Sequence, residues 1–474
     1  MKDRPLPLAV SRREALTRCG LGMAGLSLGL LLGEEQKAHA ARSPLAATPP
    51  HFAPRAKRVI HLFLNGGLSH LDSFDYKPAL AKHAGKALPD LGPDGDDRKG
   101  IALPSPFAFK RYGSNGLMVS DLFENLGRKI DEVCVVQSMH TDSPEHGDAR
   151  QLWHCGSIAQ NSPSAGAWVT YGLGSENESL PAFVALCPGN GQLPEDGSTG
   201  WRAGFMPPIY QGTLVDTGEI RDVEKLIRNV RNPFLSGPDH RRQIDLLHKL
   251  NRRHLAERGG DPTLEGRIQS YEMAYRMQSA ATEAFDLARE PDYIHRLYGD
   301  TKPAQQMLLA RRLIERGVRF VQVWPYHNQP FDSHENLTSL EPVARHCDRA
   351  ISALLTDLSA RGLLDETLVV MCGEFGRMPT AQGEMEGTVR TGRNHNPHCC
   401  NVILAGGGIR SGIVFGASDE FGYRAVEDPV HVNDLQATML HLLGINHEQL
   451  TYHHAGRDYR LTNLGGNVVK GMLA

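Results

Sequence analysis

The sequence predicts an α/β protein with a largely parallel central sheet that is covered on both faces. Six short apolar runs have the length of strands and no polar alternation, which is typical of strands buried on both sides. Helical patterns separate the later runs, and alternation of strand and helix favours parallel strands. The six runs are residues 59–64, 133–136, 183–186, 320–324, 368–372 and 402–405.

Two helices are predicted around the later strands. Within residues 344–361, four apolar residues starting at Ile351 recur at i, i+3, i+4 and i+7, which places them on one helix face. Gly362 follows, and glycine is favoured just past a helix C-terminus. A second helix over residues 304–317 precedes the strand at 320–324. The order helix, strand, helix, strand predicts a parallel βαβ unit.

The chain is predicted to contain one large domain, residues 57–474. Residues 41–56 are rich in proline, alanine and serine, and we interpret them as a linker. Residues 239–290 are polar and helical in pattern without any strand signal. We therefore expect a helical insertion there within the domain.

The first forty residues have the features of a twin-arginine signal peptide. Arg12 and Arg13 precede a glycine-interrupted apolar stretch at residues 21–33, shorter than the roughly 20 residues that a permanent membrane span needs. Ala38 and Ala40 then form the small-x-small pattern of a cleavage site. We expect removal of this segment and export through the twin-arginine machinery to the periplasm or the cell exterior. A membrane anchor and an ordinary secretory signal are the alternatives.

Charge and cysteine content exclude several classes of protein. The whole chain has a net charge of −3, and the first forty residues carry six basic and four acidic side chains, so the remainder carries −5. That balance does not favour a nucleic-acid or anionic-membrane surface. Of eight cysteines, Cys19 lies in the signal and the other seven form no CxxC pair. This pattern argues against a disulfide scaffold and fits folding in a reducing cytosol.

Acidic and histidine residues occur at the ends of predicted strands, where ligands bind in open α/β sheets. Asp-x-His in an extended segment, as at 332–334, points both side chains the same way. Carboxylate and imidazole ligands suit zinc or manganese. A purely structural polar cluster is the alternative. The predicted metal ligands are Asp72, Asp332, His334, Glu374 and His395.

A nucleophile is predicted in residues 138–148, which follow the strand at 133–136. Thr141 and Ser143 are the hydroxyl candidates, and His146 is interpreted as a ligand or an acid. A hydroxyl at a helix N-terminus beside a metal is well placed to attack phosphorus or sulfur. The alternative is that these residues only cap the helix.

Two arginines flank the predicted metal site. Arg377 follows the strand at 368–372, and Arg393 lies two residues before His395. A guanidinium group can hold an oxyanion through two parallel hydrogen bonds. The alternative is that both arginines pair with the nearby carboxylates.

Several motifs together resemble the domain-of-unknown-function 1501 family, whose members usually carry a twin-arginine signal. The resemblance extends over nearly the whole chain after the signal. Its motifs are residues 65–78, 204–207, 211–213, 361–377, 392–395, 404–408 and 455–462.

That family is similar, at the level of fold, to the alkaline phosphatase and sulfatase superfamily. The resemblance implies a three-layer α/β/α sandwich with a metal site at the strand ends and hydrolysis of phosphate or sulfate esters. It also implies that Asp332 and His334 match an Asp and a His ligand of the superfamily. By the same comparison Glu374 matches a strand-end Asp and His395 matches the late His ligand.

The sequence departs from the superfamily pattern at two positions. Phe375 stands where a second ligand, His or Asn, is expected, and Asn65 replaces the acid that ends the first strand, so Asp72 would have to substitute for it. The Cys/Ser-x-Pro-x-Arg signature of sulfatases does not occur. One metal or an inactive relic is therefore expected in place of a two-metal site.

These features predict an exported metal-dependent hydrolase of phosphate or sulfate esters. The expected substrate is a small-molecule or polysaccharide ester, and the expected cofactor is a divalent metal, zinc first, with manganese or calcium as alternatives. A non-catalytic envelope protein that binds a carbohydrate or a partner is the competing hypothesis. Asn65 and Phe375, where superfamily ligands are missing, favour it.

Overall fold

The computed structural model describes residues 44–88, 100–189, 199–220, 283–385, 388–463 and 465–474, with isolated helical positions between 226 and 276. The chain divides into two units, residues 1–46 and 47–474, and the fold described here is that of the second. The predicted signal peptide, the first three linker residues and most of the predicted helical insertion lie outside the described residues. The later linker contacts the domain, since the amide of Ala56 donates to the Leu442 carbonyl at 2.9 Å.

The described residues form a nine-stranded sheet in the order β14-β4-β13-β8-β1-β7-β5-β6, with β17 also beside β4. Only β13 runs against the others, and it is antiparallel to both β4 and β8. The strands are β1 (Arg58–Phe63), β4 (Val133–His140), β5 (Phe183–Cys187), β6 (Thr213–Asp216), β7 (Phe320–Val323), β8 (Thr367–Cys372), β13 (Cys400–Ala405), β14 (Ile413–Phe415) and β17 (Val430–His431).

The predicted α/β class and the largely parallel sheet are confirmed. All six predicted strands are present, five of them within two residues of the predicted ends, while β4 continues four residues further to His140. The sequence did not predict β6, β14 and β17. These strands have two to four residues, and most of their side chains are only partly buried. They therefore lack the long apolar run by which a buried strand is recognised.

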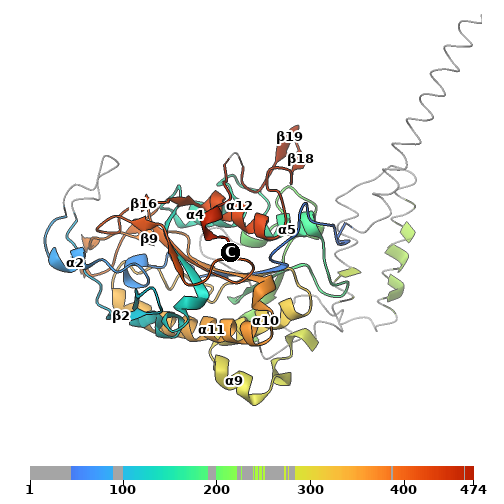
Figure 1. The fold of residues 1–474 in the computed structure, drawn as a ribbon. Coiled ribbons are helices and arrows are strands. Elements are labelled where there is room, and N and C mark those ends of the chain that lie inside the picture. The colour runs from blue at the N-terminus through green and yellow to red at the C-terminus, as the bar shows by residue number, and fades with distance from the viewer. Residues whose placement is uncertain are drawn as a thin grey trace, which may run out of the picture. The chain divides into compact units, whose positions relative to one another are not determined.

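Helices cover both faces of the sheet. Figure 1 shows α10 and α11 on one side and α4, α5 and α12 on the other, which is a three-layer arrangement. The predicted helices at 304–317 and 344–361 correspond to α10 and α11. The helices are α2 (Pro78–Lys82), α3 (Glu124–Gly127), α4 (His146–Cys155), α5 (Ala165–Leu173), α9 (Asp292–Tyr298), α10 (Lys302–Glu315), α11 (Leu340–Ala360) and α12 (Val432–Leu442).

Short two-stranded sheets accompany the main sheet. The pair β9–β12 matters most, because it sets His395 opposite Arg377. The pairs in the described residues are β2 (Phe109–Tyr112) with β3 (Leu117–Ser120), β9 (Gly376–Arg377) with β12 (His395–Asn396), β10 (Gly383–Met385) with β11 (Thr388–Arg390), β15 (Ala417–Ser418) with β16 (Ala425–Glu427), and β18 (Tyr452–His454) with β19 (Arg457–Tyr459).

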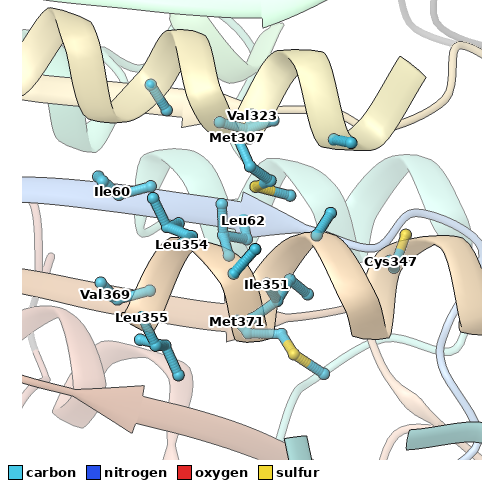
Figure 2. Packing of buried hydrophobic residues seen from close by; sticks show 14 of the residues in the cluster. Ile60, Leu62, Met307, Val323, Cys347, Ile351, Leu354, Leu355, Val369 and Met371 are labelled. Carbon is cyan, nitrogen blue, oxygen red and sulfur yellow. The ribbon is translucent and has the colours of Figure 1, made fainter. Parts of the chain in front are cut away.

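The main hydrophobic core lies between the sheet and the helices α10 and α11. Figure 2 shows Ile60 and Leu62 of β1 beside Ile351 and Leu354 of α11, with Met307 of α10 in the same layer. All five side chains are at most 2% exposed. The helical spacing that begins at Ile351 thus marks the buried face of α11, as predicted.

Replacing Leu354 with alanine is expected to lower the free energy of unfolding by about 2–5 kcal/mol. The side chain is fully buried, so the change removes apolar burial and leaves a cavity that the packed sheet fills incompletely. Urea denaturation of the two proteins measures the difference. Ser359→Ala, on the exposed side of the same helix, is the control and should change the free energy by less than about 0.5 kcal/mol.

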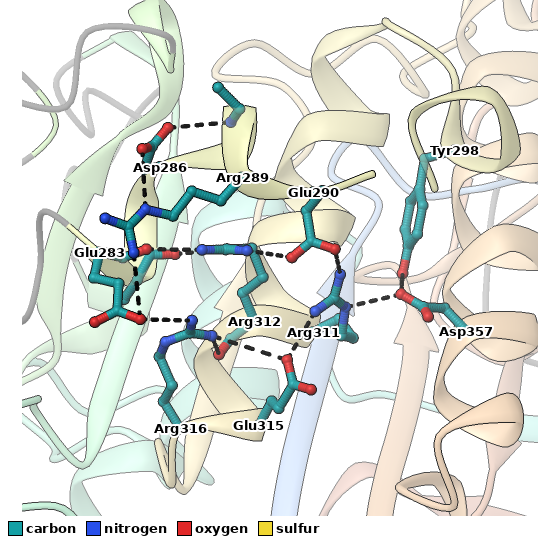
Figure 3. Close-up of polar contacts among 12 residues, drawn as sticks. Glu283, Asp286, Arg289, Glu290, Tyr298, Arg311, Arg312, Glu315, Arg316 and Asp357 are labelled. Carbon is teal, nitrogen blue, oxygen red and sulfur yellow. Dashed lines mark hydrogen bonds and ion pairs between the residues drawn. The ribbon is translucent and has the colours of Figure 1, made fainter. Parts of the chain in front are cut away.

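A buried network of charges joins α10 and α11 to Glu290, two residues before α9 (Figure 3). The Glu290 carboxylate contacts Arg311 at 2.5 Å and also Arg312. Arg311 lies 2.8 Å from Asp357 of α11, which also accepts a 3.1 Å hydrogen bond from the Tyr298 hydroxyl. The four charged side chains are at most 9% exposed. Each is tolerated in the interior because an opposite charge faces it.

Candidate metal centre

The candidate site lies at the edge of the sheet where β4, β8, β1 and β7 end. Asp332 and His334 follow β7, and His146 begins α4 after β4. His395 reaches the same edge because β13, which it precedes on β12, runs against its neighbours and so begins where they end. Sheet topology therefore gathers side chains that are up to 249 positions apart in the printed sequence.

Three imidazole rings point their Nε2 atoms at the Asp332 carboxylate. Oδ1 lies 2.8 Å from His334 Nε2 and 3.2 Å from His395 Nε2, and Oδ2 lies 3.4 Å from His146 Nε2. One ligand atom each of His146, Asp332 and His395 falls within 4.8 Å of the others. The side chains of Asp332 and His334 are 24% and 21% exposed, so an ion or substrate can reach the cluster from solvent.

The opposite nitrogen of each ring is held by an acceptor. A ring whose Nδ1 faces an acceptor carries its proton there, which leaves the Nε2 lone pair pointing inward. Metal-binding histidines are commonly oriented in this way. The acceptors are Glu374 Oε1, 2.7 Å from His146, the Pro144 carbonyl, 2.7 Å from His395, and Gln382 Oε1, 2.5 Å from His334.

This arrangement needs positive charge at its centre. Nitrogen lone pairs and a carboxylate repel one another at these distances unless a proton or a metal ion lies between them. Three imidazoles and one carboxylate form a donor set that suits zinc and other first-row transition ions, whereas calcium prefers six to eight oxygen ligands. The ligand atoms of His146, His395 and Asp332, which lie within 4.8 Å of one another, therefore fit a bound transition ion, and His334 Nε2 lies beside them, 2.8 Å from Asp332 Oδ1.

Without a metal, protons and Arg377 supply the positive charge. Burial lowers the pKa of His146, but hydrogen bonds with Asp332 and Glu374 outweigh it and raise the pKa to about 9. Burial raises the pKa of Asp332, but hydrogen bonds from the three histidines and the Arg377 charge hold it well below its usual value. Burial is the main reason that the pKa of His395 is lowered. A metal ion would replace the proton on His146, so metal binding releases a proton.

Glu374 stands behind His146 and is not among the converging ligand atoms. It is fully buried, its two oxygens accept from the Gly66 amide at 2.9 and 3.0 Å, and it faces His146 Nδ1. Gly66 has φ of +111°, and a Cβ there would lie 2.5 Å from the backbone nitrogen of Asp332. The glycine turn after β1 is thus required for the fit between Glu374 and the Asp332 loop. The sequence predicted that Glu374 is a metal ligand, but in the structure it contacts His146 Nδ1 and lies outside the group of converging ligand atoms.

Replacing Glu374 with glutamine is expected to weaken metal binding by about 10- to 100-fold, because it removes the charge that orients His146 and makes it a stronger donor. Isothermal titration of metal-free protein with zinc measures the change. The exposed Glu366, paired with Lys57, offers a control, and Glu366→Gln should bind zinc like the native chain. Equal affinity of all three proteins would contradict the orienting role.

Arg377 is engaged entirely with protein groups. Its guanidinium lies 2.6 Å from Asp332 Oδ1, donates to the Gly67 carbonyl at 2.9 Å and to the Arg393 carbonyl at 3.0 Å, and contacts the Gly66 carbonyl. The side chain is fully buried. The sequence predicted that Arg377 holds an oxyanion. In the structure its donors instead bind Asp332 and the surrounding backbone.

Arg393 and Asp72 pair with each other. The guanidinium donates to both carboxylate oxygens, at 2.8 and 3.2 Å, and both side chains are fully buried. Ser69 also donates to Asp72 at 2.5 Å. Asp72 belongs to neither group of converging ligand atoms in the described part of the chain. Arg393 thus pairs with a nearby carboxylate, which was the alternative expectation. Asp72 does not lie with the three histidines.

The two candidate nucleophiles differ in how their hydroxyls are used. Ser143 accepts a 3.1 Å hydrogen bond from the amide of Glu145, the residue just before α4, so its oxygen is used in a local turn. Thr141 directly follows β4 and is 5% exposed, and its hydroxyl has no partner among the described residues. The Thr141 amide donates to the Pro397 carbonyl at 2.8 Å, which places this segment beside β12. Of the two hydroxyls, that of Thr141 is the one without a hydrogen-bond partner among the described residues.

Phe375 and Asn65 occupy the positions where the superfamily resemblance implied ligands. The Phe375 ring lies 4.3 Å from the His395 ring and 4.9 Å from the His146 ring, between centroids. Asn65 is fully buried and donates to the Asn328 carbonyl. Phe375 thus forms an apolar wall behind two of the imidazoles, and Asn65 links β1 to the loop after β7.

A second group of possible ligands, His70, Asp75 and Cys399, also lies within 4.8 Å. His70 Nε2 is 2.7 Å from the Gly422 carbonyl, and its Nδ1 accepts from the Arg377 amide at 3.3 Å. Lys77 lies 3.0 Å from Asp75. Because both ring nitrogens have partners and an ammonium group already balances the carboxylate, this group fits a structural role.

The family model described as protein of unknown function, DUF1501, matches residues 56–473. The chain belongs to the DUF1501 family. The match covers all strands of the sheet and every residue of the candidate centre. No curated protein matches the chain in sequence.

Solved structures similar to this DUF1501 chain are distant in sequence. A protein in the alkaline phosphatase superfamily from Vibrio parahaemolyticus is 10% identical, with 86% of this chain and 71% of that chain covered and a TM-score of 0.37. The PsFucS1 sulfatase from Pseudoalteromonas sp. is 13% identical, with 83% and 69% covered and a TM-score of 0.35. Ps i-CgsB in complex with a neocarrahexaose is 11% identical, with 82% and 72% covered and a TM-score of 0.35.

Sequence reasoning missed the acceptors that orient two of the histidines. Gln382 lies in an irregular segment after β9, and no spacing relates it to His334. Pro144 contributes only its carbonyl, which leaves no side-chain signal. In the sequence, the pair Gly66–Gly67 after β1 was the one sign that two backbone segments come close together at this site. No described helix of this DUF1501 chain is long and apolar enough to cross a membrane.

Proposed function

We propose that the chain is an exported, metal-dependent hydrolase of phosphate or sulfate esters. The observation that carries the proposal is the convergence of three Nε2 atoms on Asp332, with every Nδ1 held from behind. Export rests on the paired arginines and apolar stretch of residues 1–40. A small-molecule or polysaccharide ester is the proposed substrate.

The proposed ligands are His146, His334, His395 and Asp332, and zinc is the proposed ion. A zinc ion bound there supplies Lewis-acid polarisation of the ester oxygen and stabilises charge that develops during hydrolysis. Glu374 holds His146 in the orientation that presents Nε2. Arg377 positions Asp332 by binding Oδ1 while it also binds the backbone of the glycine turn.

Thr141 is the proposed nucleophile. Its hydroxyl lies at the carboxyl end of β4, five residues before His146, and is not used for capping. In the proposed reaction the hydroxyl oxygen bonds to phosphorus or sulfur, the alcohol leaves with a proton, and water then releases the anion. Ser143 is less suited because its oxygen already accepts from the helix start.

A non-catalytic binding protein is the second candidate, and one observation favours it. Arg377, which contacts Asp332, and Arg393, two residues before His395, are both fully buried and bound to protein acceptors. Neither is presented for the charged ester group that a hydrolase must hold. Such a protein would keep a structural metal and bind its ligand without turnover.

Metal removal distinguishes the two candidates. We expect chelator-treated protein to lose hydrolysis of an aryl phosphate or an aryl sulfate and to recover it with about one equivalent of zinc. Thr141→Ala should bind zinc normally and remain inactive. Zinc binding without turnover of either ester, even at high protein concentration, would support the binding protein. Failure to bind zinc would overturn the zinc-dependent hydrolase.

A further inference from the structure

One face of α4 forms a buried polar ridge that leads from the candidate centre into the protein. His146, Arg150 and His154 follow one another at intervals of four residues, so they lie on the same side of the helix. All three are at most 6% exposed. His154 at the far end faces the sheet, with its ring 5.3 Å from the ring of His61 on β1. Neither His61 nor His154 takes part in the candidate centre.

A small cavity lies between this end of α4 and the sheet. His61, Trp153, His154, Gln322 and Gln436 are among the residues that line it. The cavity leaves about 20 Å³ for the centre of a water molecule. One water needs roughly 10–15 Å³ by the same measure. The space therefore suits one water and is too small for an organic ligand.

Two imidazole nitrogens from the lining residues have no hydrogen-bond partner among the described residues. They are His61 Nδ1 and His154 Nε2. Burial lowers the pKa of His61 to about 4 and holds the pKa of His154 well below its usual value, so both rings are neutral near pH 7. A buried polar atom without a partner destabilises the folded protein. Two of them beside one cavity indicate a shared ligand.

The hydrogen bonds around His154 define what that ligand must offer. The amide oxygen of Gln322 lies 2.8 Å from His154 Nδ1 and also accepts from the Trp324 indole at 3.3 Å. The amide nitrogen of Gln322 donates to the Gly200 carbonyl at 2.8 Å. His154 therefore carries its proton on Nδ1, and Nε2 must accept a hydrogen bond. The ligand at Nε2 has to be a donor.

His61 Nδ1 can be either a hydrogen-bond donor or an acceptor toward the same ligand. Its Nε2 lies 3.6 Å from the Cys372 sulfur, so the thiol donates to the ring or the ring donates to sulfur. In the first case Nδ1 is a donor, and in the second it is an acceptor. A water molecule has two donors and two acceptors, so it satisfies His154 and both forms of His61.

We propose that this cavity is a specific binding site for a single water molecule that bridges His61 Nδ1 and His154 Nε2. The water donates to His154 and completes the polar contacts between α4 and β1. It fixes the inner end of the helix whose first residue is His146. The site does not depend on the proposed hydrolase activity.

A crystal structure of the native protein at high resolution tests the proposal directly. We expect one ordered density peak within about 2.7–3.2 Å of both nitrogens. A cavity without density, a peak that contacts only one nitrogen, or an anomalous signal of a metal ion would overturn it.

The sign of a change in Tm gives an independent test. If water bridges the two rings, His61→Leu removes one of the two groups that hold the buried water and leaves the water one hydrogen bond short, so Tm falls by a few degrees. If the cavity is dry, the same change removes an unsatisfied nitrogen, and Tm stays the same or rises. His453→Leu, at a side chain on β18 that is 69% exposed, is the control and should leave Tm unchanged.

Discussion

Replacing Asp332 with alanine is expected to abolish metal binding and ester hydrolysis together. Asp332 is the one carboxylate that all three imidazole Nε2 atoms face, at 2.8 to 3.4 Å. Its loss removes the anionic ligand and leaves Arg377 to repel a cation. Without the metal, the transition state loses several kcal/mol of stabilisation, so kcat/KM of the variant should fall by about 10³-fold or more.

Metal content by mass spectrometry and turnover of the aryl esters should be measured on the same samples. Asp332→Asn keeps the shape of the side chain and should lose zinc as well, which separates charge from packing. Asp458→Ala, at a side chain that is 66% exposed, is the control for loss of an aspartate. Native zinc content in Asp332→Ala would remove Asp332 from the ligand set.

Replacing Glu290 with glutamine is expected to destabilise the protein by about 3–5 kcal/mol, the largest effect on stability that the structure predicts outside the hydrophobic core. Glu290 is the shared partner of Arg311 and Arg312, which are 1% and 3% exposed. Removing one partner of a buried ion pair leaves the other charge uncompensated, which applies here to Arg312, while Arg311 keeps its contact with Asp357. Urea denaturation at pH 7 measures the loss. Glu341→Gln, in the exposed pair with Arg345, should change stability by less than about 0.5 kcal/mol.

The same network gives stability a dependence on pH. Burial raises the pKa of Glu290, but hydrogen bonds and charges of Arg311 and Arg312 outweigh it and hold the pKa below its usual value. A carboxyl with a lowered folded-state pKa stabilises the fold above the unfolded pKa, about 4.3 for glutamate, and stops doing so as pH falls through the folded value. The difference in stability between native protein and Glu290→Gln should therefore shrink below about pH 4.

The sheet was predictable because its central strands are buried on both faces. Residues 368–372 show this well, since every side chain from Thr367 to Cys372 is buried and the sequence has an unbroken apolar run. The antiparallel direction of β13 was not predictable, because two strands that pack on the same helices show the same apolar run whichever way they point. That direction is what brings His395 to the edge where Asp332 lies.

The candidate centre was predictable in part. Asp332, His334 and His395 could be named because strand-end positions gather at one edge of a parallel sheet. Whether a nearby charged residue contacts the cluster or stands behind it depends on distances of a few ångströms, which sequence spacing does not contain. For this reason Glu374, which the sequence predicted as a ligand, is found behind His146 in the structure. Asp72 and Arg393 likewise form a pair with each other.

The polar face of α4 shows the same limit. His146, Arg150 and His154 recur every four residues in the sequence, but a regular polar spacing usually marks a solvent-exposed side of a helix. Here the ridge faces inward, because Glu374, Gln322 and His61 provide partners from three strands or strand ends. Only the packing of α4 on the sheet reveals that these residues are buried.

Anomalous diffraction at the zinc edge, from crystals of the native protein loaded with zinc, tests the proposed centre most directly. We predict one strong peak bounded by the Nε2 atoms of His146, His334 and His395 and by the Asp332 carboxylate. Glu374 should remain bound to His146 Nδ1 and to the Gly66 amide, without contact to the ion. No peak at this position, or a peak bound only at another site, would contradict the metal centre and the hydrolase that is built on it.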